Sequence, residues 1–369
     1  MCPYFKRYVS LFSIFILRKR DMSVQHRPRI FVDKGRSFCF ILELILISIG
    51  LGFNLNLSQA QSSKTSHIPE KIVLAHATPL NSTPVYVAVE KGYFKPELDV
   101  SLRSFPAGRD TLNEVLKGTA DVATVAETPF MYAVMKGAKP SIIATISETT
   151  NYLLIIGRKD KGLALPGDLR GKKIGVPIGT GGEFFLDNVL IFNGIPKNSI
   201  KKVDLPPEKM VAPMQKSEVD AVVSWEPFAH ELLNALGANA FTYYGDTAYN
   251  RYTWNLVAQK GWIEKKPGTV RKVIQALIHG VSFIKKNPSE ARKIAARYSK
   301  VDGSEIDGAW GSTIFKIVLH PSLLMSLEDQ ARWAIRGKLT DAKTVPNFLN
   351  YISFDGLAAV DPAAVTIAH

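Results

Sequence analysis

One local pattern recurs along the chain: a short apolar run ends at hydroxyl residues or glycines, and a helical pattern then follows and stops at glycine. It occurs in KIVLAHATPLNSTPVYVAVEKG (71–92), DVATVAETPFMYAVMKG (121–137), KKIGVPIGTGGEFFLDNVLIFNG (172–194) and DAVVSWEPFAHELLNALG (220–237). Strands that alternate with helices predict a parallel α/β sheet. Ligands of such sheets bind beyond the carboxyl ends of the strands, which here are the four junctions.

The residue types at these junctions suit both local capping and ligand binding. Thr83-Pro84 and Thr128-Pro129 each fit a helix N-cap followed by proline at the first helical position. A helix start also presents unpaired N–H groups and a partial positive charge, which together hold a small anion. Capping explains any single junction, but four junctions on one chain, with a glycine-rich one at 179–182, favour a shared binding site.

The first 60 residues are typical of a secretory signal segment. An apolar run at 38–53 follows several basic residues and leads to the small-residue pattern Ser58-Gln59-Ala60. We expect export to the periplasm with cleavage near Ala60, and an uncleaved anchor helix is the alternative. Both cysteines, Cys2 and Cys39, lie in this segment. The mature chain therefore has no thiol for nucleophilic or metal chemistry.

Charge and motif content argue against several other classes of function. The formal net charge is +13, but no block of five or six like charges marks a nucleic-acid tail. The histidines are scattered at spacings that build no metal site, and the motifs of serine hydrolases, zinc proteases and phosphate-transfer loops are missing from the sequence. We expect no cofactor, no metal and no nucleic-acid partner.

Four stretches resemble the landmarks of one family, the substrate-binding proteins of ABC importers for nitrate, sulfonates, taurine and thiamine precursors. They are TPVYVAVEKGYFKPELDVSL, AGRDTLNEVLKGTADVATVAETPFM, LRGKKIGVPIGTGG and VDAVVSWEPF, in the order usual for the family. The resemblance implies an α/β type II periplasmic-binding-protein fold whose two lobes close on a ligand. One lobe would take residues 68–155 and about 251–369, and the other residues 156–250.

The resemblance also implies a site and partners. Hydroxyls and backbone N–H groups would hold the head of a small anionic or zwitterionic compound, and Trp225 would cover its organic part. The implied ligand-facing positions are Thr78, Asn81, Thr83, Glu127, Thr128, Gly179, Thr180, Gly181, Trp225 and Glu226. Arg109 would pair with an anion at the rim or remain a solvated residue. The protein would be a monomer that delivers its ligand to an ABC permease in the inner membrane.

Two acidic residues complicate a purely anionic ligand. Glu127 and Glu226 would repel a sulfonate or nitrate unless the ligand also carries a cationic group. They suit an amino-sulfonate or a cationic heteroaromatic precursor, and each equally suits a solvated acid at a helix start. A hydrolase or lyase on the same fold, with these carboxylates as general acid and base, is the alternative from a different class.

Overall fold

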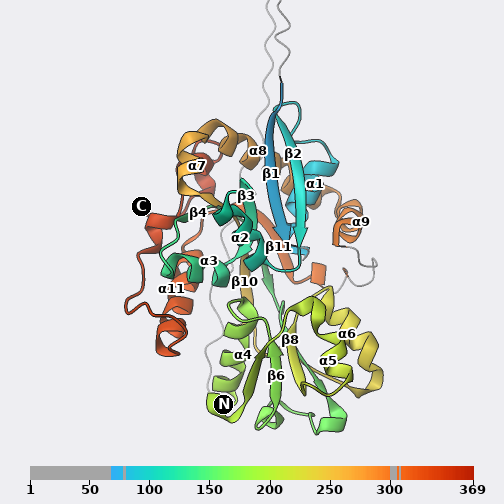
Figure 1. The fold of residues 1–369 in the computed structure, drawn as a ribbon. Helices are drawn as coiled ribbons and strands as arrows, with labels where there is room; N and C mark the ends of the chain where they lie inside the picture. Colours follow the sequence, from blue (N-terminus) through green and yellow to red (C-terminus); the bar gives the residue numbers. More distant parts are fainter. Residues whose placement is uncertain (1–67, 78–79, 300–305, 307–308) are drawn as a thin grey trace, which may run out of the picture. The chain divides into compact units, whose positions relative to one another are not determined.

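The strands form two mixed sheets in the computed structural model, which describes residues 68–77, 80–299, 306 and 309–369 (Figure 1). The six-stranded sheet has the order β11-β4-β10-β3-β1-β2, and the five-stranded sheet has the order β7-β6-β8-β5-β9. The first comprises β1 (Glu70–Ala77), β2 (Leu98–Phe105), β3 (Val122–Ala126), β4 (Pro140–Thr150), β10 (Arg251–Gln259) and β11 (Thr313–Val318). The second comprises β5 (Leu154–Arg158), β6 (Lys173–Val176), β7 (Lys201–Asp204), β8 (Ala221–Ser224) and β9 (Ala240–Tyr243).

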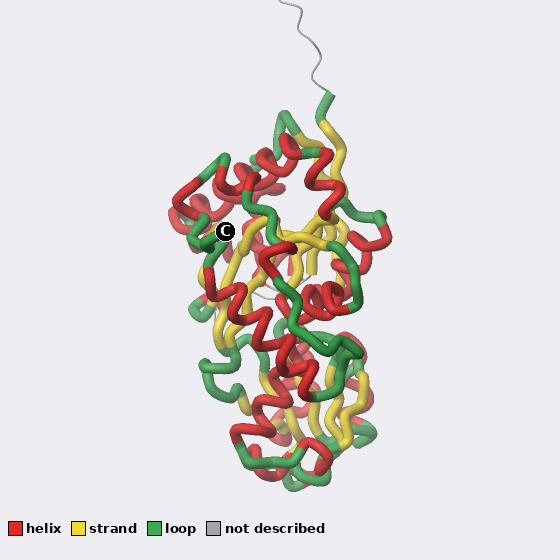
Figure 2. Tube along the Cα trace, turned by 90° about the vertical axis from the view of Figure 1, so that its left-hand side faces the viewer, coloured by secondary structure: helices red, strands yellow, loops and turns green. Residues whose placement is uncertain are grey.

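Helices flank both sheets (Figure 2). They are α1 (Thr83–Glu90), α2 (Gly108–Lys117), α3 (Glu127–Met135), α4 (Gly181–Phe192), α5 (Val211–Gln215), α6 (Phe228–Leu236), α7 (Lys260–Lys265), α8 (Pro267–Lys286), α9 (Pro288–Ser299), α11 (Pro321–Arg336) and α12 (Asp355–Ala358). Helix α1 packs on α8 and α9, and α3 packs on α11. The predicted α/β class, with each sheet covered by helices, is confirmed.

The prediction of a purely parallel sheet is wrong. Strands β2, β1 and β3 are parallel, as are β7, β6 and β8, but β10 runs antiparallel to β3 and β5 runs antiparallel to β8. In each sheet, this antiparallel strand directly follows a connection between the sheets. Strand β5 follows the connection from β4, and β10 follows the connection from β9. The sequence pattern of single strands carries no signal for these long-range pairings.

All four predicted junctions exist as strands followed by helices. They are β1 to α1, β3 to α3, β6 to α4 and β8 to α6. Strands β1 and β3 are neighbours in the six-stranded sheet, and β6 and β8 are neighbours in the five-stranded sheet. Because neighbouring parallel strands end at the same edge, each sheet presents two helix starts together.

Among these four junctions the predicted side-chain cap forms only at α4. There Thr180 Oγ1 accepts a hydrogen bond from Gly182 N at 3.2 Å. Helix α3 begins at Glu127 with Ala126 as its N-cap, so Thr128 lies inside the first turn and caps nothing. The assignment of Thr83 as the cap of α1 is also wrong, because the N-cap is Ser82 and it makes no side-chain cap bond. The hydroxyl of Thr128 is therefore not used for capping.

Two short connections carry the chain between the sheets, and Asn250 fastens them to each other. The first joins β4 to β5 through residues 151–153, and the second joins β9 to β10 through residues 244–250. The buried Asn250 side chain donates to the carbonyls of Leu153 and Tyr244, each at 2.7 Å, and accepts from Leu153 N at 3.1 Å. The lobe boundaries that the family resemblance implies, residues 68–155 with about 251–369 and residues 156–250, remain a prediction.

The predicted signal segment and Thr78 lie outside the described residues. Within the described ranges, the helices include none with the length and apolar character needed to cross a membrane.

Candidate functional site

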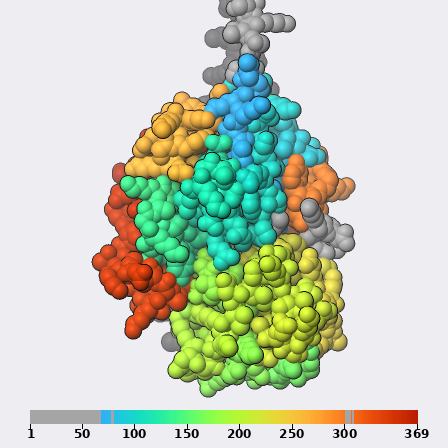
Figure 3. Space-filling model, viewed as in Figure 1, coloured from blue at the N-terminus to red at the C-terminus, as the bar shows by residue number. Residues whose placement is uncertain are grey.

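A small cavity of about 20 Å³ lies where helix starts from the two sheets approach each other. We call it the donor compartment, and the residues around it include Gly108, Arg109, Thr180, Gly181, Trp225 and Trp254. Helices α2 and α4 begin at two of these residues, so their first backbone N–H groups lie here. In Figure 3 the yellow-green side chains of the five-stranded part lie directly against the teal side chains of the α2 region.

Glycine is required at the start of α4 by a close approach. A Cβ atom on Gly181 would lie 2.8 Å from Cε1 of Tyr252, and the hydroxyl of Tyr252 donates to the Gly181 carbonyl at 3.2 Å. Any side chain there would clash with a buried ring. The glycine-rich sequence thus lets a strand of one sheet touch the helix start of the other.

Arg109 is neither a free rim residue nor fully solvated. Its Nη1 donates to the carbonyl of Ile178 at 2.5 Å, and its Nε lies 3.7 Å from Oδ1 of Asp110. The guanidinium therefore reaches from α2 to the loop that precedes α4. It brings one positive charge to the edge of the donor compartment.

Six buried donor atoms at the junctions, on β10 and on the connection from β4 to β5 have no hydrogen-bond partner among the described residues. They are Asn81 Nδ2, Thr128 Oγ1, Tyr152 OH, Ser224 Oγ, Trp225 Nε1 and Trp254 Nε1. Every one of these groups can donate a hydrogen bond, and the two indole groups can only donate. A buried donor without a partner costs about 1–3 kcal/mol. The arrangement therefore favours a ligand that brings several acceptor atoms.

Four aromatic rings form one wall of this region. Tyr152 stacks on Trp225 with 6.1 Å between ring centroids and 26° between the ring planes. The same ring meets Tyr252 and Trp254 edge-on, at 6.0 and 5.9 Å. Trp225 is 4% exposed, so it is largely covered by protein. The wall offers flat apolar surface for the organic part of a ligand.

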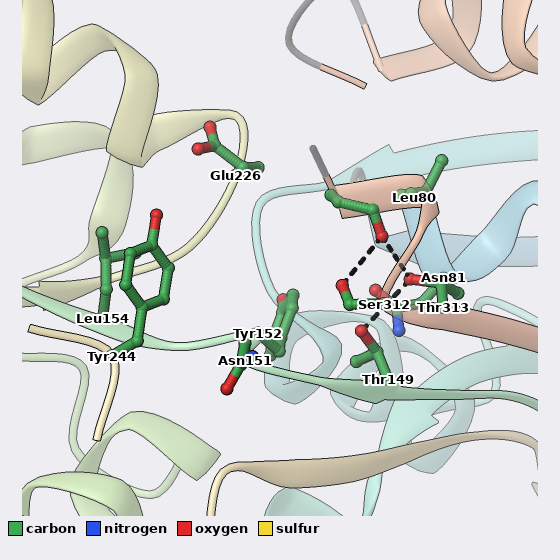
Figure 4. Close-up of a pocket in the computed structure, with 11 residues that line it drawn as sticks. Leu80, Asn81, Thr149, Asn151, Tyr152, Leu154, Glu226, Tyr244, Ser312 and Thr313 are labelled. Carbon is green, nitrogen blue, oxygen red and sulfur yellow. Dashed lines mark hydrogen bonds between the residues drawn. The ribbon is translucent and has the colours of Figure 1, made fainter. Parts of the chain in front are cut away.

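A second cavity, of about 320 Å³, lies on the other side of Tyr152, and we call it the polar cavity. Figure 4 shows the carboxylate of Glu226 and the ring of Tyr244 on one side of it, with Asn81 and Thr149 across from them. One oxygen of Glu226 accepts a hydrogen bond from His230 N at 3.1 Å. The described residues that line this cavity include no Lys or Arg. Glu226 contributes a carboxylate to this described lining.

Glu127 is buried, which corrects the expectation of a solvated acid at a helix start. It is 1% exposed, and its Oε1 accepts from Thr253 N at 2.7 Å and from Ser326 Oγ at 3.3 Å. Burial raises the pKa of this carboxyl to about 7. Glu127 lines neither the donor compartment nor the polar cavity. The structure thus does not bring Glu127 and Glu226 together around one cavity.

Two more of the residues predicted to face the ligand, Thr83 and Gly179, use a polar group in a hydrogen bond within the protein. Thr83 Oγ1 donates to the carbonyl of Leu80 at 2.5 Å. The N–H of Gly179 donates to Glu183 Oε2 at 3.0 Å, and this glycine lies at a separate cavity of about 480 Å³ beside α2 and α3. Asn81, Thr180, Gly181, Trp225 and Glu226 line the donor compartment or the polar cavity.

The sequence patterns missed Tyr152, Tyr252 and Trp254. They lie on the first connection between the sheets and on β10, outside the four junctions. A sequence signal for Tyr152 does exist, because it is an aromatic residue in a short segment between two apolar strands. The described residues contain no group of three or more His, Cys, Asp or Glu side chains placed to hold a metal ion.

Comparison with known families decides the relationship. A family model described as NMT1/THI5 like matches residues 80–291, which is more than half of the chain. The chain belongs to the NMT1/THI5 like family. This confirms the resemblance that the four sequence landmarks indicated.

Relatives of this NMT1/THI5 like protein include named binding proteins. A putative binding protein of Brucella abortus (strain 2308) is 25% identical over 228 residues, which cover 60% of this chain and 69% of the relative. The taurine-binding periplasmic protein of Escherichia coli (strain K12) is 23% identical over 163 residues, which cover 44% of this chain and 50% of that protein.

Solved structures confirm the periplasmic-binding-protein fold of this NMT1/THI5 like chain. The alkanesulfonate-binding protein SsuA from Xanthomonas axonopodis pv. citri, bound to MOPS, has a TM-score of 0.65 at 16% identity and covers 78% of this chain and 99% of its own. The desulfurization enzyme DSZB has a TM-score of 0.59 at 14% identity and covers 80% and 99%. Binding proteins and an enzyme therefore share this fold, and function must be argued from the site.

Proposed function

We propose that this protein is the binding component of an ABC importer and captures a small organic sulfonate between its two sheets. The observation that carries the proposal is the set of six buried donors without a partner among the described residues, four of which line the two cavities: Asn81, Tyr152, Trp225 and Trp254. A sulfonate presents three acceptor oxygens, and hydrogen bonds to charged acceptors contribute about 1.5–3 kcal/mol each. The starts of α2 and α4 add backbone N–H groups and favourable dipoles.

The polar cavity narrows the ligand class within the proposal. Its described lining combines the carboxylate of Glu226 with neutral hydrogen-bonding groups. A carboxylate accepts several hydrogen bonds at once, so Glu226 can accept from a ligand ammonium in addition to the bond from His230 N. The proposed ligand is therefore an amino-sulfonate of the taurine type. A cationic heteroaromatic precursor lacks a head group with three acceptor oxygens for the donors that line the two cavities.

The relatives support the same proposal. One is named a taurine-binding periplasmic protein, and a solved structure of the same fold is an alkanesulfonate-binding protein. By analogy we propose export to the periplasm, action as a monomer and an inner-membrane permease as the partner. A hydrolase or lyase acting through paired carboxylates is disfavoured, because Glu127 and Glu226 do not share a cavity.

Isothermal titration calorimetry tests the proposal. Purified protein is titrated with taurine and, as a matched ligand without the amine, with ethanesulfonate. We expect one-to-one binding of both, with taurine the tighter ligand, and loss of that preference in Glu226→Gln. Chromatography of the mixtures after long incubation completes the test. Steady accumulation of a product, or no heat with any sulfonate, would contradict the proposal.

A further inference from the structure

Tyr152 occupies the boundary between the two cavities. It lies on the short connection from β4 to β5, and it lines both the donor compartment and the polar cavity. Figure 4 shows it beside Asn151, between the Glu226 side and the Thr149 side of the polar cavity. A ligand that reaches from one cavity into the other must therefore pass this ring.

The hydroxyl of Tyr152 is available as a donor. Its oxygen is buried and has no hydrogen-bond partner among the described residues. Burial holds the pKa of this hydroxyl well above its ordinary value, so the proton stays on the oxygen at neutral pH. The ring is held by Trp225, Tyr252 and Trp254 through aromatic contacts. The position of the side chain thus does not depend on a bond made by its hydroxyl.

The sizes of the cavities show why this ring matters. The donor compartment has a volume of about 20 Å³, whereas the polar cavity has about 320 Å³. A volume of about 10–15 Å³ accommodates a single water molecule, so the smaller space cannot take a sulfonate group without movement of its wall. Among the described residues, Tyr152 is the one that lines both cavities.

We propose that Tyr152 determines ligand specificity: its hydroxyl donates to the sulfonate head, and its ring limits the bulk of the organic part. This inference rests on the proposed function. The hydroxyl adds to the donors already around the junctions, and the ring separates the anion-binding end from the polar cavity. Short sulfonates fit beside the ring, and bulky ones are excluded by it.

The test measures affinities of three variants for two probes, ethanesulfonate and the bulkier 4-toluenesulfonate. Tyr152→Phe should bind ethanesulfonate at least tenfold more weakly while the melting temperature of the free protein stays unchanged. Tyr152→Ala should raise the affinity ratio of 4-toluenesulfonate to ethanesulfonate at least tenfold. Tyr93→Phe is the control, because Tyr93 packs edge-on against His279 at 5.7 Å and lines neither cavity.

The results that would contradict this inference differ from those that would contradict the proposed function. The inference would be overturned, and the proposed function would stand, if the wild type binds ethanesulfonate, Tyr152→Phe binds it with the same affinity, and Tyr152→Ala keeps the wild-type affinity ratio. If Tyr152→Ala fails to fold, Tyr152→Phe still decides the role of the hydroxyl. Absence of any sulfonate binding to the wild type would contradict the proposed function and this inference with it.

Discussion

The carboxylate of Glu127 accepts a hydrogen bond from the backbone N–H of Thr253 at 2.7 Å, and both residues are buried. The contact ties the start of α3 to β10, the strand that follows the second connection between the sheets. Ser326 on α11 donates to the same carboxylate oxygen at 3.3 Å. Glu127 therefore braces three elements of the six-stranded part.

This brace predicts a dependence of stability on pH. Burial raises the pKa of Glu127 to about 7 from an ordinary value of 4.5, so the folded state holds this proton more tightly than the unfolded state. The contribution of Glu127 is fully present below pH 4.5 and is lost as the pH rises through about 7. The change in unfolding free energy across this window is on the order of 3 kcal/mol.

Urea denaturation between pH 5 and pH 8 checks this prediction. Glu127→Gln should remove this part of the pH dependence, while the exposed Glu290→Gln should keep the wild-type slope. If the unfolding free energies of the wild type and of Glu127→Gln change in parallel with pH, the Glu127 carboxyl has an ordinary pKa and the prediction is wrong.

Asn250→Ala should strongly destabilise the protein. The variant leaves the buried N–H of Leu153 and two carbonyls without their partners, at a cost of about 2–4 kcal/mol. Denaturation in urea measures the loss. Asn239→Ala is the control, because this half-buried asparagine forms solvent-exposed hydrogen bonds with Asp160 and its loss should cost less than about 1 kcal/mol. Equal losses would refute the fastening role of Asn250.

Variants of Thr180 and Thr128 should distinguish an effect on stability from an effect on ligand binding. Thr180→Ala removes the side-chain cap of α4 and should lower the unfolding free energy by about 1 kcal/mol. Thr128→Val keeps the shape of the side chain and removes a buried hydroxyl that bonds to no described residue, so the unfolding free energy should not fall, whereas sulfonate binding should weaken. Denaturation and calorimetry on both variants give the comparison. Unchanged affinity in Thr128→Val would remove Thr128 from the proposed site.

Trp333→Phe should destabilise the contact between α11 and α4. The indole Nε1 donates to Oδ2 of the buried Asp187 at 2.9 Å, and Lys202 lies 2.6 Å from Oδ1 of the same carboxylate. Loss of a hydrogen bond to a charged acceptor costs about 1.5–3 kcal/mol in unfolding free energy. Trp262→Phe is the matched control, because its Nε1 has no partner among the described residues. Equal effects would assign the loss to ring packing.

The sequence predicts the four junctions well because each is a local pattern of apolar period, hydroxyl or glycine, and helix stop. It predicts the roles of individual side chains less well. Whether Thr128 caps a helix depends on a boundary shift of two residues, and Thr180 and Thr128 look alike in sequence. The burial of Glu127 depends on β10 and α11, which are more than a hundred residues away. Tyr152 and Asn250 acquire their roles only when the two connections meet.

The most direct test of the central claim is a crystal structure of the protein with taurine. We expect the sulfonate group to lie at the starts of α2 and α4, within hydrogen-bond distance of Tyr152 OH or Trp225 Nε1, and the ammonium to face Glu226. A taurine molecule bound away from both cavities, for example beside Gly179 in the cavity of about 480 Å³, would contradict it.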